Sequence, residues 1–526
     1  MTYAPVSHRA ELCRKAVSSR LSVVGHLCSR KVDGCNGEPY VAFGGPMSTT
    51  TRDASFALNP VSPGTVPLGR KSQITNRKWW GLALRLKHLF GVDRAIAYTV
   101  LARVLQILGS TGTVLLIFRF LTPVEQGYYY TLLSLVALQT VFELGFSFVI
   151  LQMAAHECAH LTLHPDGRVE GDPVAHARLA SILQKTRRWY LVAAVVLCVS
   201  LLPVGTYFFS HHARTATPVA WQGPWVVAVF ATAFVFLLNP FFSFLEGCGQ
   251  VWQVGRMRFG QALLGAGMAW AALLSHHGLY SPGMVNLGYA AAGLVFLYSR
   301  RDLCLGLLRQ PSRQEAVSWR REVWPFQWKI AVSWISAYFS LTVFTPILFA
   351  YRGPTEAGQF GMALSITGYL STLVLAWVST KATPFGQMIA RGEISQLRRT
   401  FFRTLGQALS LLVFAAAGCE AAVFALQHFF PRLSARIAPP QIFALLLLAC
   451  VSSFVVQSMA IYLRSFKREP YLVQSVVVAA STVILALLAV KTWGVAGVAL
   501  SYFVCTGLIG LSYGIVVFNR SRDLRV

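Results

Sequence analysis

The chain has 526 residues, of which 55% are hydrophobic and 13% charged, and its mean hydropathy is +0.54. Soluble proteins carry roughly 25% charged residues, so these values exclude a soluble globular protein, and they exclude disorder over most of the chain. We therefore expect an all-α polytopic membrane protein. The formal net charge of +26 would suggest a nucleic-acid partner in a soluble protein, but membrane topology explains it below.

The first part of the chain differs from the rest. Residues 1–76 are mixed polar sequence, for which we expect a disordered, basic cytoplasmic tail, with Met47 as an alternative start. In 77–91, Trp79, Leu82 and Leu86 share one helical face, which predicts an amphipathic helix on the inner leaflet. Simple topogenic charge is the alternative interpretation of this segment. No signal peptide is expected, because the first long apolar run begins near Ala95.

Twelve apolar stretches are long enough to cross about 30 Å of hydrocarbon as helices. In chain order they are 96–118, 129–154, 189–209, 225–245, 257–275, 284–299, 328–350, 360–379, 405–427, 441–463, 472–490 and 495–518. The pattern predicts that Asn239-Pro240 breaks the fourth span.

Basic residues distribute unevenly between the loops that connect these spans. Most of the loop Lys and Arg fall in alternate loops, and the opposite loops hold Arg119, Arg214, Arg352, Arg432, Arg436 and Lys491. By the positive-inside rule the richer loops face the cytoplasm, which places both termini there. This bias, with the basic tail, accounts for the net charge without a nucleic-acid partner.

A short motif repeats at equivalent positions. The sequence P-x-E-x-G occurs at 123–127, after the first span, and at 354–358, after the seventh. Six predicted helices separate the copies, so the halves share one orientation. We therefore expect two six-helix bundles, 92–310 and 311–519, followed by a cytoplasmic tail, 520–526. Two bundles with a cleft between them are typical of an alternating-access transporter.

Four segments resemble a known family. They are FLTPVEQGYYYTLLSLVALQTVFELGFSFVILQ (120–152), FLEGCGQVWQVGRMRF (244–259), WPFQWKIAVSWISAYF (324–339) and GPTEAGQFGMALSITGYL (353–370). They are similar to bacterial O-antigen and polysaccharide flippases of the multidrug/oligosaccharidyl-lipid/polysaccharide exporter superfamily. The resemblance covers about 92–520. It implies a MATE-like fold that moves a sugar on a polyprenyl diphosphate across the inner membrane for lipopolysaccharide or other surface polysaccharide. The long N-terminal tail departs from the family.

Ionisable residues inside spans are costly and usually functional. Arg103 and Lys329 lie in equivalent first helices of the two halves, and we expect them to bind the substrate diphosphate. An Arg103–Glu143 salt bridge is the alternative for Arg103, and snorkelling to the interface is the alternative for Lys329. Glu143 and Glu420 are candidates for H+ or Na+ coupling, against a plain structural role. The polar residues added to the predicted substrate site are Gln106, Gln139, Asn239 and Arg258. Gln327 and Gln457 are further polar neighbours in the spans, and Glu246 and Arg256 lie with Arg258 at the inner end of the fourth span and in the following loop.

Other motifs carry less weight. Trp334, Tyr338, Trp377 and Tyr128 could stack on sugar rings, although interfacial aromatic belts are the commoner explanation. Residues 156–160 (HECAH) match the zinc-protease pattern H-E-x-x-H, but no third ligand follows, so we expect no metal and no catalytic residues.

The sequence therefore predicts a flippase of lipid-linked oligosaccharide without a cofactor. Its expected partners are that substrate, membrane lipids and a polysaccharide polymerase or glycosyltransferase. A small-molecule or drug exporter on the same fold is the alternative, and a membrane zinc protease is the third.

Overall fold

The computed structural model describes residues 94–164, 167–212, 218–310, 317–466 and 470–522, which belong to one compact unit, Asn76–Val526. The expected tail 1–76 and amphipathic helix 77–91 lie outside the described residues. The first half contains α3 (Arg94–Phe120), α4 (Pro123–Val136), α5 (Gln139–Glu143), α6 (Phe146–Cys158), β1 (Leu161–Leu163), β2 (Val169–Gly171), α7 (Pro173–His212), α8 (Gln222–Gly247), α9 (Val251–Leu274), the 3₁₀ turn η1 (Gly278–Tyr280), α10 (Ser281–Tyr298) and α11 (Arg301–Arg309).

The second half is helical throughout its described part. It contains the π-turn η2 (Trp319–Val323), α12 (Trp324–Leu341), α13 (Phe344–Arg352), α14 (Pro354–Ser379), α15 (Ala382–Ala390), α16 (Ile394–Phe429), α17 (Pro431–Ser434), α18 (Pro440–Arg464), α19 (Leu472–Tyr502), the π-helical segment η3 (Phe503–Gly510) and α20 (Leu511–Arg522). Strands β1 and β2 form a two-stranded antiparallel hairpin between α6 and α7.

Helices lie at all twelve predicted spans. In the described part of the chain, seven helical stretches are long and apolar enough to cross a membrane, or eight if the bent pair Pro123–Glu143 and Phe146–Cys158 is one span. The other predicted positions correspond to α3, α9, α10 and the second half of the stretch Leu472–Ser521. Large apolar side chains such as Phe414 and Val295 face outward, 80% and 73% exposed, as expected for a surface in contact with lipid.

The stretch Leu472–Ser521 forms two spans and not one. Its 50 residues would reach about 75 Å as a straight helix, more than twice the hydrocarbon thickness. The chain reverses at Gly494, whose φ of 57° and ψ of −134° are not helical. Across this reversal the Tyr471 hydroxyl donates to the Gly514 carbonyl at 3.1 Å, and Gln474 Nε2 donates to the Gly510 carbonyl at 2.8 Å. The separate predictions for 472–490 and 495–518 are confirmed.

Two predictions about helix breaks are wrong. The fourth span is continuous, because α8 runs through Pro240 without a break; membrane helices tolerate proline where neighbouring groups satisfy the freed carbonyl. The second span, predicted as one helix over 129–154, is interrupted at Leu144 and Gly145, which have φ values of 53° and 66°. The helices on either side of this break are bent by 41°.

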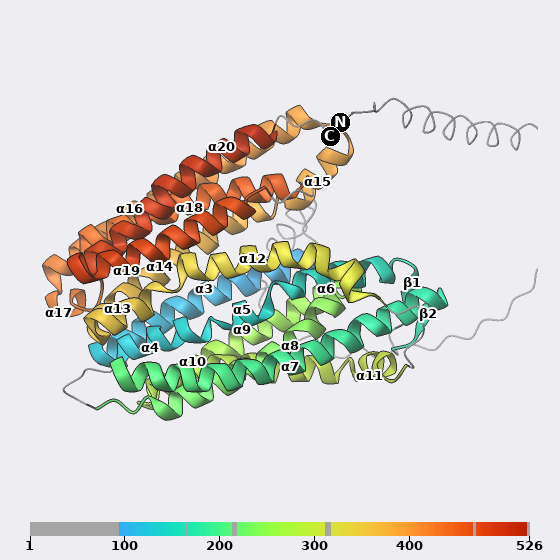
Figure 1. Ribbon diagram of the computed structural model, residues 1–526, viewed down its shortest axis with the longest axis horizontal. Coiled ribbons are helices and arrows are strands. Elements are labelled where there is room, and N and C mark those ends of the chain that lie inside the picture. Colours follow the sequence, from blue (N-terminus) through green and yellow to red (C-terminus); the bar gives the residue numbers. More distant parts are fainter. Residues whose placement is uncertain (1–93, 165–166, 213–217, 311–316, 467–469, 523–526) are drawn as a thin grey trace, which may run out of the picture. The chain divides into compact units, whose positions relative to one another are not determined.

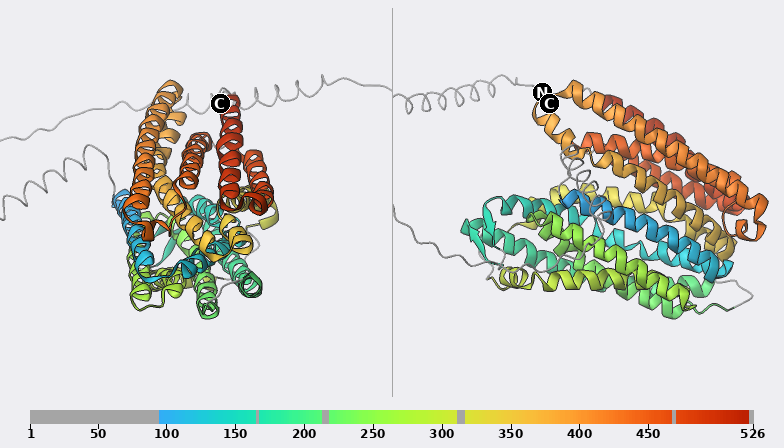
Figure 2. Two further views of the ribbon diagram at one scale, coloured as in Figure 1. Left: turned by 90° about the vertical axis from the view of Figure 1, so that its left-hand side faces the viewer. Right: turned by 180° about the vertical axis from the view of Figure 1, so that it is seen from behind.

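The helices of the two halves are joined through α4, α12 and α14. Within the first half α9 packs on α3 and α10, and α8 packs on α6, α7 and α10. Within the second half α18 packs on α14, α16 and η3. Figures 1 and 2 show the orange and red helices of the second half on one side and the cyan and green helices of the first half on the other, with α12 between them. Helix α12 contacts both α19 and α5, and α4 packs along α14.

Candidate functional site

The two P-x-E-x-G motifs contact each other directly. A Cβ atom placed on Gly127 would lie 1.9 Å from the carbonyl oxygen of Pro354, and one on Gly358 would lie 2.8 Å from the backbone nitrogen of Gly127. The backbones of α4 and α14 therefore touch where both helices begin. Only glycine permits such an approach, because any side chain would collide with backbone atoms that cannot rotate away. We call this the motif contact.

Hydrogen bonds reinforce the motif contact. Thr122 and Glu125 form a reciprocal capping box at the start of α4, which satisfies backbone donors that the first turn leaves free. Next to it, Gln126 is 1% exposed. Its Nε2 donates to the carbonyls of Gly358 at 3.0 Å and Arg436 at 2.9 Å. One buried side chain of the first half thus holds two backbone segments of the second.

Arg436 ties the same end of the molecule together. Its guanidinium donates to the carbonyls of Ile117 and Phe118, each at 3.2 Å, and of Leu121. These carbonyls belong to the last turn of α3 and the residue after it, where a helix has no internal donors and carries partial negative charge. Burial lowers the pKa of Arg436, and the nearby carboxylate of Glu125 opposes this shift. A loop of the second half therefore caps a helix of the first.

A cavity of about 670 Å³ lies where α12, α18 and α19 of the second half meet α5 of the first. It begins beside Ala137 of α4–α5 and Thr342 at the end of α12, and it extends along α18 and α19 to Arg464 and Tyr471. The lining side chains that carry polar groups are Thr140, Ser333, Trp334, Tyr338, Ser340, Thr342, Ser453, Gln457, Arg464, Tyr471, Gln474, Ser475 and Thr506. Because the hydroxyl of Tyr338 donates to the Ser134 carbonyl at 3.1 Å, the cavity is bounded by α4 toward the motif contact.

Among the described residues that line this cavity, the positively charged side chain is that of Arg464, at the end of α18. In the sequence Arg464 directly follows the predicted span 441–463, a position typical of a cytoplasmic loop charge. Lys329 lies on α12 one turn before the lining residue Ser333 and is exposed. Residues four apart share a helix face, so Lys329 lies on the face of α12 that contributes Ser333 to the cavity, one turn closer to the start of the helix. Its ammonium group lies 5.9 Å from the centre of the Trp328 ring.

Glu143 lies at the break in the second span. Its Oε1 accepts a hydrogen bond from the Ser147 hydroxyl at 2.6 Å. The next carbonyl, that of Leu144, is freed by the break and accepts a hydrogen bond from the buried side chain of Gln327 on α12. A Cβ on Gly145 would lie 2.4 Å from Ile330 Cγ2, so α12 packs directly on the break. Interrupted helices of this kind are typical of ion and substrate sites in transporters.

The other predicted site residues whose side chains the structure describes are not among the residues that line the cavity. Arg103 lies in α3, but its side chain is outside the described residues. The predicted salt bridge between Arg103 and Glu143 is therefore outside them as well. Gln106 is exposed on α3, and Gln139 is half-buried on α5 beside the lining residue Thr140. The remaining three are Asn239, half-buried on α8; Arg258, whose Nη2 donates to Glu246 at 2.6 Å; and Glu420, whose Oε2 is buried without a hydrogen bond in the described part of the chain.

The four predicted sugar-stacking aromatics have different surroundings. Trp334 and Tyr338 line the cavity. Trp377 is 54% exposed on α14, outside the lining. Tyr128 is 1% exposed and packs between Phe209 and Phe349, with ring centroids 5.4 and 5.0 Å away. Tyr128 therefore belongs to the core that joins the halves and cannot stack on a ligand in this conformation.

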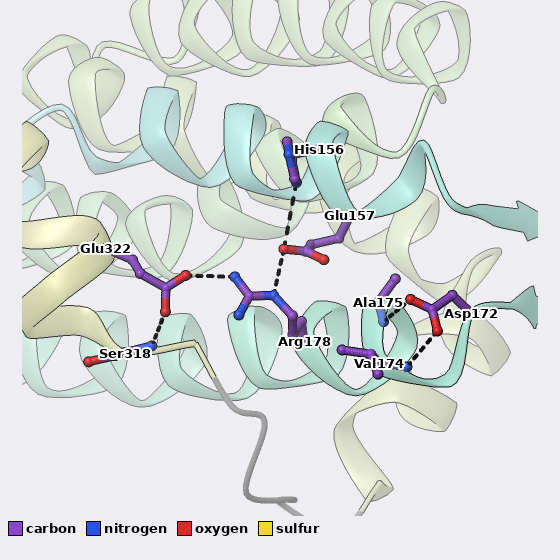
Figure 3. A network of polar contacts seen from close by, with 8 residues as sticks. All are labelled: His156, Glu157, Asp172, Val174, Ala175, Arg178, Ser318 and Glu322. Atoms are coloured by element: carbon purple, nitrogen blue, oxygen red, sulfur yellow. Dashed lines mark hydrogen bonds and ion pairs between the residues drawn. The ribbon is translucent and has the colours of Figure 1, made fainter. Parts of the chain in front are cut away.

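The residues of the HECAH segment form an ion-pair network at the opposite end from the motif contact. Glu157 is buried and accepts a hydrogen bond from Arg178 Nε at 2.9 Å, while Arg178 Nη2 donates to Glu322 of η2 at 2.6 Å (Figure 3). Arg178 and the backbone N–H of Ser318 hold the pKa of Glu322 below its usual range. In the part of the chain that the structure describes, no group of three His, Cys, Asp or Glu side chains could hold a metal ion.

This network yields a prediction about the HECAH segment. Glu157→Gln is expected to lower the thermal stability of the purified protein, by about 2 kcal/mol, because it leaves the guanidinium of Arg178 without its buried charged partner. His160→Ala is expected to leave stability nearly unchanged. Thermal unfolding of the purified full chain measures the stability of both variants, and its zinc content is determined in the same samples. Stoichiometric zinc that is lost in the His160 variant would contradict the structural role of this segment.

No family model and no curated protein matches this sequence. Among solved structures, the chain is similar to a MATE crystallised in the straight conformation, with a TM-score of 0.51, 13% identity, and coverage of 82% of this chain and 98% of the other. Matches to the lipid II flippase MurJ in an inward closed conformation (81% of this chain, 89% of the other) and to an inward-facing multidrug resistance MATE transporter (79% and 99%) each have 13% identity and a TM-score of 0.49. The chain therefore has a MATE-like fold, an all-α polytopic architecture.

Proposed function

We propose that this chain is a flippase that moves polyprenyl-diphosphate-linked oligosaccharide across the bacterial inner membrane by alternating access. The observation that carries the proposal is the cavity between the halves, with Arg464 on its wall and Lys329 one turn beyond it. A diphosphate needs cations in a partly dehydrated site, where charge-assisted hydrogen bonds are about twice as strong as neutral ones. Hydroxyl and amide groups along the same wall suit a sugar.

The orientation follows from the charge bias of the loops. With both termini in the cytoplasm, the motif contact lies at the outer face, and Arg464 and Lys329 lie on the cytoplasmic side. The conformation is then closed to the outside, ready to receive a substrate made in the cytoplasm. Moving the substrate outward requires α4 and α14 to separate and the opposite end to close, which is a population shift between two states.

Coupling to H+ or Na+ is assigned to Glu143. Its carboxylate is next to the interrupted backbone, and α12, which carries Lys329, packs on that interruption through Gln327. A change in the charge of Glu143 would therefore act on the helix that we assign to substrate binding. Arg103, Gln106, Gln139, Asn239 and Arg258 remain proposed members of the substrate site.

Export of a small molecule or drug is the second candidate, and Glu420 favours it. Its Oε2 is buried on α16 and has no hydrogen-bond partner among the described residues, and an unpaired carboxylate suits a cationic cargo. The fold does not choose between these activities, since fold alone does not determine function.

Deletion in the native host separates the two candidates. The flippase proposal expects polyprenyl-linked oligosaccharide to accumulate on the cytoplasmic side, surface polysaccharide to fall, and drug sensitivity to stay unchanged. Complementation with the wild-type chain should reverse both changes. Increased drug sensitivity without accumulation of the lipid-linked sugar would favour the exporter and overturn the flippase proposal.

A further inference from the structure

A second pocket, of about 490 Å³, lies between α9 and α10, away from the cavity between the halves. The two helices are close-packed at one end, where Gln261 Nε2 donates to the Tyr289 carbonyl at 3.0 Å and the backbones of Gly265 and Gly288 touch. The pocket lies beyond this contact, toward the start of α9 and the end of α10.

Two arginines line the pocket: Arg256 of α9 and Arg300, which directly precedes α11. No acidic side chain pairs with either one in the described part of the chain. The Nε of Arg300 is buried and has no hydrogen-bond partner among the described residues. Gln253 Oε1, an acceptor in the same pocket, also lacks a partner there. A buried guanidinium N–H without an acceptor is costly, so the site favours an anionic ligand.

Two neighbouring arginines, Arg258 and Arg301, have acidic partners. Arg258 pairs with Glu246 at 2.6 Å, and Arg301 lies 3.6 Å from Asp302 and 4.6 Å from the centre of the Tyr298 ring. Arg256 and Arg300 have no such acidic partner among the described residues, although both line the pocket. Arg256 instead lies 5.9 Å from the centre of the Trp252 ring, and Trp side chains are enriched at the membrane–water interface.

The rest of the pocket wall is largely apolar and open to lipid. It includes Leu264, 45% exposed, and Val295, 73% exposed. Arg256, Gly260 and Leu264 are spaced four residues apart on one face of α9, so the pocket extends about 12 Å along the helix. A cationic end followed by an apolar groove matches a lipid with an acidic headgroup, and not a free anion.

We propose that this pocket binds an anionic phospholipid of the cytoplasmic leaflet. Arg256 and Arg300 hold the headgroup phosphate, and the acyl chain lies against Leu264 and Val295. The predicted orientation places this end of α9 and α10 at the cytoplasmic face, where acidic lipids are concentrated. The site lies apart from the cavity between the halves, so the lipid is a ligand additional to the transported substrate.

The test titrates the purified full chain in detergent with phosphatidylglycerol or phosphatidylcholine of the same acyl chains, and counts bound lipids by native mass spectrometry. The wild type is expected to bind phosphatidylglycerol about tenfold more tightly, because only this lipid offers an unbalanced phosphate to the arginines. The double variant Arg256→Gln with Arg300→Gln should lose this preference. The control, Arg301→Gln with Arg309→Gln, removes two charges from exposed positions of α11 and should keep it.

A charge-neutral variant keeps the test independent of the arginines. A Cβ on Gly260 would meet only the Cβ of Ala292, at 4.0 Å, so Gly260→Leu should fold and fill the pocket, and phosphatidylglycerol binding should again fall about tenfold. Three results would overturn the proposal: equal binding of the two lipids, an equal loss in the α11 control, or full binding in Gly260→Leu. Displacement of the lipid by excess inorganic phosphate would identify a site for free phosphate instead.

Discussion

Gly127→Ala is expected to open the motif contact and to abolish transport, and Gly358→Ala to do the same to a smaller extent. The added methyl group of the first variant would lie 1.9 Å from a backbone oxygen of Pro354, and that of the second would lie 2.8 Å from a backbone nitrogen of Gly127. Neither backbone can avoid the collision by a rotamer change, so α4 and α14 must separate. Because the proposed alternating-access cycle requires this contact to close in each turnover, separation would trap the protein in one state.

A single reporter cysteine measures this separation. Met362 of α14 is 0% exposed, and its sulphur lies 3.9 Å from Gln126 Nε2 at the motif contact. In a cysteine-free background, the thiol introduced by Met362→Cys should resist a membrane-impermeant maleimide added from outside, and Gly127→Ala should make it reactive. The matched control is Gly368→Ala on the same helix, where a Cβ would have nothing within 4 Å. Normal transport and an unreactive reporter thiol in Gly127→Ala would contradict the gating role of the contact.

The sequence predicted the motif repeat but not the contact between its copies. Periodicity and composition report on which residues form a helix and where it ends, and both P-x-E-x-G motifs do begin helices, α4 and α14. Which helix packs on which depends on side-chain shapes that are far apart in the chain. The repeat carried one usable signal, since a glycine at the same motif position in both halves predicts a close backbone approach near the axis that relates them.

Helix breaks show why local rules fail in this fold. Proline at position 240 predicts a break, yet α8 is continuous there, while the actual break is at Leu144. A leucine at positive φ has no sequence signature, because that conformation is unfavourable for a branched side chain. It is held by tertiary contacts: Gln327 binds the freed carbonyl of Leu144, and Ile330 packs on Gly145. These residues belong to α12, which the sequence could not place beside α5.

The cation on the cavity wall was missed for a related reason. Arg464 ends the apolar helix α18, and a basic residue in that position has the same sequence pattern whether it fixes topology or faces a ligand. Lys329 was singled out because it lies inside a span, and the structure places it on the same helix face as Ser333.

Lys329→Ala is expected to reduce transport of lipid-linked oligosaccharide at least tenfold without reducing the amount of protein in the membrane. A charge-assisted hydrogen bond to phosphate contributes about 1.5–3 kcal/mol, which corresponds to a factor of about 10 to 100 in binding. Lys329→Arg should retain much of the activity, because the guanidinium keeps the positive charge and adds donors. Transport is measured as surface polysaccharide in the deletion strain complemented with each variant.

Lys491 supplies the matched control. Its ammonium group also lies over an aromatic ring, 5.7 Å from the centre of Tyr351, against 5.9 Å for Lys329 and Trp328. Lys491 belongs to α19 near the reversal at Gly494, at the far end from Lys329, and it is not among the cavity-lining residues. Lys491→Ala should therefore transport normally. If Lys329 only snorkels to the membrane–water interface, both alanine variants should have the same small effect on transport. Equal activity of the two variants would therefore remove Lys329 from the substrate site.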